Sequence, residues 1–200
     1  MNEIIFATSN RGKVATLQSH LAIHGLDDIE IVQSTFELIE PQASTALEVA
    51  TSKAKQAHAI TNAPVLVDDS SFHIYAMGGF PGPYIKYMLE TVGAEGIVRF
   101  MEGQRDRRAY GMSALVFVDE NGQLHTFSVQ GEDGGIAEEV RESIDDSGWS
   151  DLWKIFIPTG STKTLSQMTP EDHEMRHKSE HGRSSYNHFA EWLKEHLNKS

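Results

Sequence analysis

The amino-acid sequence predicts an α/β protein that folds as one domain, residues 1–200, with two lobes and a cleft between them. The opening of the chain reads strand–helix–strand–helix–strand, which is the pattern of an α/β architecture. Asn121-Gly122 separates two further strand-like runs, and this dipeptide is typical of a β-hairpin turn. No linker rich in proline, glycine or serine divides the chain, so a single domain is expected.

The expected elements follow from the spacing of the apolar residues. Short apolar runs predict three buried strands over 4–8, 29–32 and 64–67. Apolar residues three or four positions apart predict two helices between them, over 11–23 and 46–57. The third strand is expected to end at Asp68 and Asp69. The rest of the chain predicts a hairpin of strands 110–118 and 124–129, followed by a third run over 134–140 that continues the sheet. A short strand over 155–158 and a closing helix over 186–197 are also predicted.

The composition excludes several functional classes. The 17 Lys and Arg residues against 29 Asp and Glu residues give a net charge of −12, whereas proteins that bind duplex nucleic acid or anionic membranes carry a basic face. The chain has no cysteine, which excludes disulfides, thiolate zinc sites and a cysteine nucleophile. No apolar run reaches the length of a membrane span, and the N-terminus lacks the basic flank of a signal peptide. We therefore expect a cytoplasmic protein with no nucleic-acid and no membrane partner.

The turn between the first strand and the first helix is a candidate phosphate-binding loop. It reads Thr8-Ser9-Asn10-Arg11-Gly12-Lys13. A helix N-terminus presents free N–H groups and the positive end of the helix dipole, and Ser9, Asn10 and Lys13 add donors and a positive charge. The glycine spacing of a Walker A loop is absent, and the alternative is an ordinary helix cap with a surface lysine.

Two carboxylates after the third strand form a second candidate site. Asp68 and Asp69 follow a buried run, and ligands of open α/β sheets bind at the carboxyl ends of strands. Adjacent carboxylates there suit Mg²⁺, which is bound by a few carboxylates together with substrate phosphates. Glu40, in the loop before the second helix, is a candidate for a third oxygen ligand. The alternative is a charged turn.

Two weaker features accompany these sites. Residues 78–84, Gly-Gly-Phe-Pro-Gly-Pro-Tyr, predict a shaped loop, because turn-forming residues dominate it and glycine lets backbone approach a ligand closely. A structural corner is the alternative for this loop. Lys53 lies beside the apolar stripe of the second helix, where it either points into a cleft or remains solvated.

Residues 173–177, His-Glu-Met-Arg-His, match the zinc-binding pattern of one class of metalloproteases. The helix that carries this pattern in such enzymes is partly buried, whereas the residues that flank 173–177 are almost all polar. A solvated charged segment is therefore favoured over a zinc protease, and metal binding by this stretch stays open.

Three segments, taken in their order and spacing, resemble the inosine triphosphate pyrophosphatases, the Ham1-like family of non-canonical purine nucleoside triphosphate pyrophosphatases. They are residues 6–13, Phe-Ala-Thr-Ser-Asn-Arg-Gly-Lys, residues 65–70, Val-Leu-Val-Asp-Asp-Ser, and residues 76–87, Ala-Met-Gly-Gly-Phe-Pro-Gly-Pro-Tyr-Ile-Lys-Tyr. The resemblance implies a two-lobed fold with a central mixed sheet flanked by helices, an active-site cleft between the lobes, and a homodimer. It also implies hydrolysis of a nucleoside triphosphate to the monophosphate and pyrophosphate with Mg²⁺ as cofactor.

The resemblance also implies roles for individual residues. Asp69 is expected to activate the attacking water with support from Asp68, and Glu40 and Asp69 are expected to bind the metal. The residues expected to bind the triphosphate and the rest of the substrate are Thr8, Ser9, Asn10, Lys13, Lys53, Ser70 and Lys86. Lysines and loop amides fit this chemistry, because they stabilise the charge that builds on phosphate oxygens.

The second half of the chain departs from the family pattern. The family's Gly-Trp/Tyr-Asp-Pro-x-Phe segment, which helps to read the base, corresponds to residues 148–156, where the Asp-Pro pair is not kept. The closing motif, a lysine followed by Ser-His-Arg-Gly, corresponds to residues 175–183, where the lysine is replaced by Met175 and the histidine and arginine are shifted. Trp153, His181 and Arg183 are the candidate base-contacting residues, and the preferred base and sugar stay open.

Three functional hypotheses follow. The leading one is a Mg²⁺-dependent pyrophosphatase acting on triphosphates of deaminated purines such as ITP, XTP and dITP. The second keeps the same chemistry on a different or modified nucleotide, because the base-reading half is changed. The third is a non-catalytic nucleotide-binding protein, against which the retained set of Lys13, Glu40, Lys53 and Asp69 speaks.

Overall fold

The fold is taken from a computed structural model that describes residues 2–144, 150–180, 182 and 184–198, with side chains for all of these except 177–180. The chain forms two compact units. Unit 1 comprises residues 1–70, 113–129 and 182–200, and unit 2 comprises residues 71–112 and 130–181. Each unit has hydrophobic core of its own.

A mixed sheet forms the framework of the described residues. Its strands are β1 (Glu3–Ala7), β2 (Glu30–Ser34), β3 (Val65–Ile74), β4 (Pro81–Gly82), β5 (Arg108–Val118), β6 (Leu124–Ile136) and β7 (Phe156–Pro158). The strand order is β2-β1-β3-β5-β6-β7, with β4 paired to β3. β1 runs parallel to β2 and β3, whereas β3 with β4 and β6 with β7 are antiparallel. The predicted α/β class with a mixed sheet and flanking helices is confirmed.

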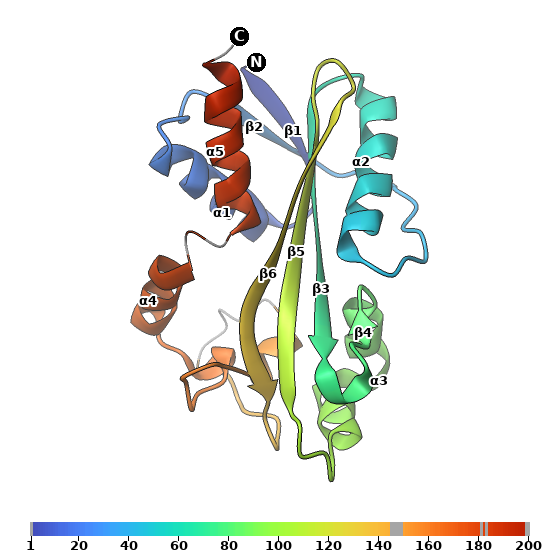
Figure 1. Ribbon diagram of the computed structural model, residues 1–200, viewed down its shortest axis with the longest axis vertical. Coiled ribbons are helices and arrows are strands. Elements are labelled where there is room, and N and C mark those ends of the chain that lie inside the picture. Colours follow the sequence, from blue (N-terminus) through green and yellow to red (C-terminus); the bar gives the residue numbers. More distant parts are fainter. Residues whose placement is uncertain (1, 145–149, 181, 183, 199–200) are drawn as a thin grey trace. The chain divides into compact units, whose positions relative to one another are not determined.

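The helices of unit 1 are α1 (Arg11–Ile23), α2 (Ala46–Thr61) and α5 (Ser185–Leu197). Side chains alternate along β3, and this alternation separates two cores. Leu66 joins the apolar faces of α1 and α5 in one core, whereas Val65 and Val67 join the alanine stripe of α2 in the other. In Figure 1, α1 and α5 accordingly lie together to the left of β1 and α2 lies to its right.

Side-chain caps fix where these helices begin. Asn10 caps α1, because its Oδ1 accepts hydrogen bonds from the backbone N–H groups of Gly12 at 2.8 Å and Lys13 at 3.3 Å. α2 begins with a capping box, in which Thr45 accepts from the N–H of Glu48 and Glu48 accepts from the N–H of Thr45. Three residues, 8–10, separate the end of β1 from the start of α1, so this helix begins at the carboxyl end of the strand.

Unit 2 holds α3 (Ile85–Phe100), α4 (Pro170–Glu180) and three short 3₁₀ turns, η1 (Tyr75–Met77), η2 (Asp151–Lys154) and η3 (Leu165–Gln167). Its core gathers residues of β3, α3, β5, β6 and β7. The guanidinium of Arg107 joins two segments that are distant in the sequence by donating to three main-chain carbonyls. It reaches Ile136 O at 2.7 Å, Met101 O at 2.8 Å, and Ala137 O.

Most predicted elements are present, and two strand boundaries were wrong. β3 does not end at Asp68 and Asp69 but continues to Ile74, because Phe72 and Ile74 enter the core of unit 2. Residues 134–136 are the end of β6 rather than a third run, and they pair with β7. The stretch 173–177 lies within α4. Among the described residues, no helix has the length and apolar character needed to cross a membrane.

Candidate active site

The candidate site of unit 1 is built around the middle of β3. The parallel pairing of β1 with β3 ends at Phe6 and Leu66, so Asp68 and Asp69 lie just beyond the paired stretch. Successive side chains of a strand point to opposite faces of the sheet. Asp68 accordingly has partners on α1 and α5, whereas Asp69 has its partner on α2.

The first face holds a buried carboxylate with two donors on one oxygen. Oδ2 of Asp68 lies 3.0 Å from Nζ of Lys13 and accepts a hydrogen bond of 2.7 Å from the hydroxyl of Tyr186. Asp68 and Tyr186 are each 8% exposed. Burial, followed by the charge of Asp68, raises the pKa of Tyr186 far above its ordinary value, so the phenol stays protonated and acts as a donor.

The second face holds two carboxylates that share one ammonium group. Nζ of Lys53 lies 2.7 Å from Oε1 of Glu40 and 3.2 Å from Oδ1 of Asp69. Burial raises the pKa of Asp69, and the charge and hydrogen bond of Lys53 oppose this rise without cancelling it. Burial lowers the pKa of Lys53, but its bonds and charge interactions with the two carboxylates outweigh burial and leave that pKa raised. Asp69 is thus a stronger base than a solvated aspartate, beside a lysine that stays charged.

The loop between β1 and α1 borders the Lys13 side of this site. The Thr8 hydroxyl accepts from the N–H of Asn10 at 3.1 Å, and the Asn10 side chain is engaged in capping α1. Ser9 is exposed. The cap does not exclude a phosphate at this helix end, because it accounts for only part of the first-turn N–H groups.

Among the other predicted site residues, only Ser70 is adjacent in the sequence to a residue of this cluster. Ser70 is exposed on β3 beside Asp69. Lys86 and Trp153 belong to unit 2. Lys86 is 73% exposed and lies 4.0 Å from Glu90, and the ring of Trp153 stacks on His173 at 5.0 Å. His181 and Arg183 lie outside the described residues.

The glycine-rich loop 78–84 of unit 2 is shaped by backbone that only glycine adopts readily. Gly78, Gly79 and Gly82 have φ values of 64°, 89° and 58°. His73 supports this loop, because its Nδ1 donates to the carbonyl of Gly79 at 3.0 Å while its Nε2 accepts from the hydroxyl of Ser71 at 2.9 Å. The prediction of a shaped loop here is confirmed, and β4 forms within it.

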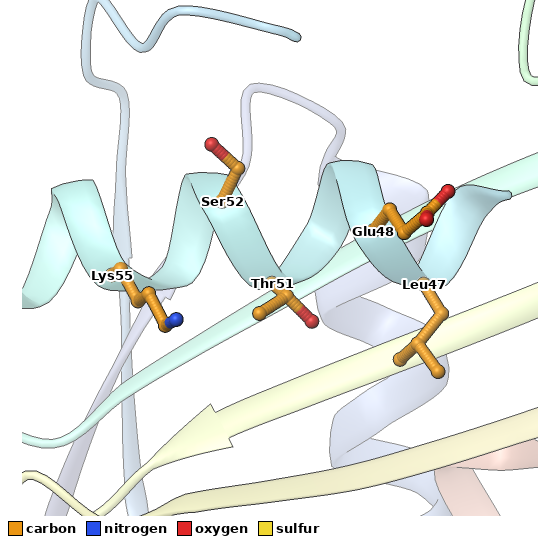
Figure 2. A pocket seen from close by; sticks show the side chains of 5 residues that line it. All are labelled: Leu47, Glu48, Thr51, Ser52 and Lys55. Carbon is orange, nitrogen blue, oxygen red and sulfur yellow. The ribbon is translucent and has the colours of Figure 1, made fainter. Parts of the chain in front are cut away.

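A pocket on α2 is separate from the candidate residues. It has a volume of about 480 Å³ and is lined by Leu47, Glu48, Thr51, Ser52 and Lys55. Figure 2 shows Leu47, Thr51 and Lys55 projecting from one side of the helix and Ser52 from the other. Lys53, whose ammonium group bridges Glu40 and Asp69, does not line this pocket. The charged cluster at β3, and not this pocket, is therefore the candidate active site.

Sequence reasoning missed Tyr186. Its only signal was a place in the apolar pattern of the last helix, which predicts a core residue and not a partner for an aspartate. The contact joins residues 118 positions apart, so no local motif contains it.

Comparison with known proteins identifies the family. The model of the Ham1 family matches residues 4–192. The dITP/XTP pyrophosphatase of Thermococcus kodakarensis is 35% identical over 194 residues, which cover 97% of this chain and 98% of that protein. The protein of the same name from Methanopyrus kandleri is 34% identical, with 96% of each chain covered.

Solved structures share the fold. The Ham1 protein of Staphylococcus aureus has a TM-score of 0.76 at 21% identity, over 97% of this chain and 99% of that one. A Ham1 protein from Coxiella burnetii has a TM-score of 0.75 at 23% identity over the full length of both chains. The matched length, the identity to curated relatives and the shared fold lead to one conclusion: this chain belongs to the Ham1 family.

Proposed function

We propose that this protein is a nucleoside triphosphate pyrophosphatase that hydrolyses non-canonical purine nucleotides, such as dITP and XTP, to the monophosphate and pyrophosphate. The observation that carries the proposal is the charged cluster on β3, where Lys53 bridges Glu40 and Asp69 and Lys13 pairs with Asp68. The names of the curated relatives support the substrate class.

The residues present fit Mg²⁺. No group of three or more His, Asp or Glu side chains gathers as a metal site among the described residues. Mg²⁺ does not need such a cage, because it is commonly held by one or two carboxylates with substrate phosphates and water completing its shell. We propose that Glu40 and Asp69 hold it, since they already share one cation, the ammonium of Lys53.

The side chains of the cluster divide the work of the reaction. When bound, Mg²⁺ would neutralise phosphate charge and acidify a water molecule. Asp69 accepts a proton from the attacking water, which its raised pKa favours. Lys13 and Lys53 each have three N–H donors, so each ammonium group can bind phosphate oxygens. The water oxygen bonds to phosphorus, the anhydride between the α- and β-phosphates breaks, and pyrophosphate leaves.

We propose the remaining assignments on the same basis. Ser9, the N–H groups at the start of α1, Ser70 and Lys86 contact the triphosphate, and Trp153, His181 and Arg183 contact the base. The family match spans 4–192, which supports one catalytic domain over residues 1–200. A homodimer in the cytoplasm is the assembly and location that we propose.

A second candidate keeps the reaction and changes the nucleotide. It is favoured by Trp153, whose ring stacks on His173 at 5.0 Å within unit 2, so one face of this indole is already engaged. A base that stacks on Trp153 would have to use its other face or displace His173.

Pyrophosphate release tests both candidates. The purified protein is incubated with Mg²⁺ and a panel of dITP, XTP, ITP, the ordinary nucleotides and modified purine triphosphates. Selective release from dITP and XTP is expected. Selective release from another nucleotide would support the second candidate, and no release from any of them would refute the enzymatic function.

A further inference from the structure

The first turn of α5 holds Tyr186 in a fixed position. Ser184 caps the helix by accepting from the N–H of Tyr186 at 3.2 Å, and the hydroxyls of Ser185 and Ser113 lie 2.7 Å apart, which joins this turn to β5. The Tyr186 ring belongs to the same core as Phe189. A buried ring anchored in this way has little freedom, so its hydroxyl can hold a partner without much loss of side-chain entropy.

The two oxygens of Asp68 have unequal surroundings. Oδ2 receives both donors, the Tyr186 hydroxyl and the Lys13 ammonium. Oδ1 is buried and has no hydrogen-bond partner among the residues that the structure describes. A buried carboxylate oxygen without a partner is costly, so such an oxygen suggests a group that the chain itself does not provide. A water molecule of a bound divalent cation is the chemistry that fits this ionised oxygen, because Asp68 and Asp69 face opposite ways and no three acidic side chains gather as a metal site among the described residues.

The two groups that donate to Oδ2 of Asp68 differ in how exposed they are and in how freely they can move. The Lys13 side chain is 22% exposed, and its ammonium can turn to a phosphate. Tyr186 is buried, and its hydroxyl has Asp68 as its acceptor. When Lys13 turns to a substrate, Tyr186 is the donor that remains.

We propose that Tyr186 is a positioning residue of the active site: its hydroxyl holds Asp68 by Oδ2 and so keeps Oδ1 available to a water molecule of the bound divalent cation. The proposal rests on the proposed function, because that function brings the cation to this site. Tyr186 acts through Asp68 and does not itself contact the substrate.

The variant Tyr186→Phe tests the proposal, because it removes the hydroxyl and keeps the ring. Mn²⁺ serves as the probe, and its binding to the nucleotide-free protein is followed by the loss of the free-ion electron paramagnetic resonance signal. We expect the Mn²⁺ dissociation constant to rise by at least about threefold and kcat for dITP to fall about tenfold, the size expected for losing a hydrogen bond to a charged group, with KM unchanged.

Phe189→Leu is the matched control. It trims an apolar side chain of the same helix and core, so it lowers the midpoint of thermal unfolding but leaves Mn²⁺ binding and kcat at 25 °C unchanged. A double-mutant cycle adds a second readout: in an Asp68→Asn background, Tyr186→Phe should weaken Mn²⁺ binding no further.

Two results would overturn the proposal: wild-type Mn²⁺ affinity in Tyr186→Phe, or an equal further loss in the Asp68→Asn background. Mn²⁺ binding requires no turnover, so this outcome is readable even if the wild-type protein releases no pyrophosphate. Failure of the proposed function and failure of this inference are therefore distinguishable.

Discussion

The two faces of β3 give neighbouring aspartates different chemistry. The Asp68 side chain is 5% exposed and faces a lysine and a tyrosine, whereas that of Asp69 is 17% exposed and shares a lysine with Glu40. Asp68 thus has one partly exposed donor on α1 and one buried donor on α5, whereas Asp69 shares a single ammonium group with a second carboxylate. Two carboxylates adjacent in sequence form two sites, because a strand turns every second side chain to the other face.

Removing the base should have the largest effect. We expect Asp69→Asn to lower kcat for dITP by about 10³-fold or more, because it removes a proton acceptor and a metal ligand together. The midpoint of thermal unfolding should not fall, since this carboxylate is destabilised by its own burial. Glu120→Gln, an exposed acid in the β5–β6 turn, is the control and should keep wild-type kinetics. A variant Asp69→Asn with near wild-type turnover would move the base to the other face.

Lys53→Met tests the Asp69 face of β3 through the pH dependence of activity. In the proposed reaction the ionised form of Asp69 is the base, so we expect activity to be lost as the pH falls through the pKa of Asp69. Lys53 lowers that pKa, and removing it raises the pKa further. We expect the acid limb of kcat/KM to move to higher pH, with a loss of about 10²-fold at neutral pH.

Lys55→Met provides the control for that experiment, because this lysine lies on the same helix two residues on and lines the pocket of Figure 2. Its pH profile should coincide with that of the wild type. An unmoved acid limb in Lys53→Met would show that Asp69 is not the group that titrates.

A substitution on the Asp68 face of β3 should lower stability more than one on the Asp69 face. Asp68→Asn leaves Lys13 without its counter-ion beside a buried amide, and we expect the free energy of unfolding to fall by about 2 kcal/mol. Lys13 is partly exposed, which keeps the loss below that of a fully buried pair. Denaturant titration measures it, with Asp106→Asn, an exposed partner of Arg108, as a control that should change far less. Equal losses in the two variants would show that the Lys13–Asp68 pair stabilises the fold no more than an exposed ion pair does.

The smallest effect concerns the cap of α1. Asn10→Ala should lower the free energy of unfolding by about 1 kcal/mol, and Asn10→Ser should restore most of it, because serine also caps well. Chemical denaturation of both variants checks this. If alanine and serine were equivalent, Asn10 would not act through the cap.

The elements that the sequence predicted correctly are those marked by periodic apolar residues or by short local motifs. The turn before α1, the apolar spacing over 46–57 and the Asn121-Gly122 turn are local, and the elements that they predict are present. α4 was not predicted because it has almost no apolar face. α3 was missed as well, and its helical pattern is interrupted by Gly93 at φ 71°.

The candidate site divides in the same way. Lys13, Asp68 and Asp69 were found because each lies in a short motif at the end of an apolar run. The bridge from Lys53 to Glu40 needed the fold, since a helix and a loop must meet at β3. Tyr186 could not be found, because an apolar pattern does not reveal the hydrogen bond that a phenol makes across 118 residues.

The Arg107 clasp of unit 2 bears on how this protein tolerates mutation. Its guanidinium is bonded to the carbonyls of Met101, Ile136 and Ala137, and these main-chain atoms are the same in every residue type. A substitution at those positions therefore keeps these hydrogen bonds as long as it preserves the packing of the buried side chains. Arg107 itself cannot be replaced in this way. The ammonium group of a lysine is a single point charge, and it cannot donate to three separate acceptors as the planar guanidinium does. Apolar substitutions of similar volume are thus expected to be tolerated at the accepting positions, whereas Arg107 is expected to tolerate none.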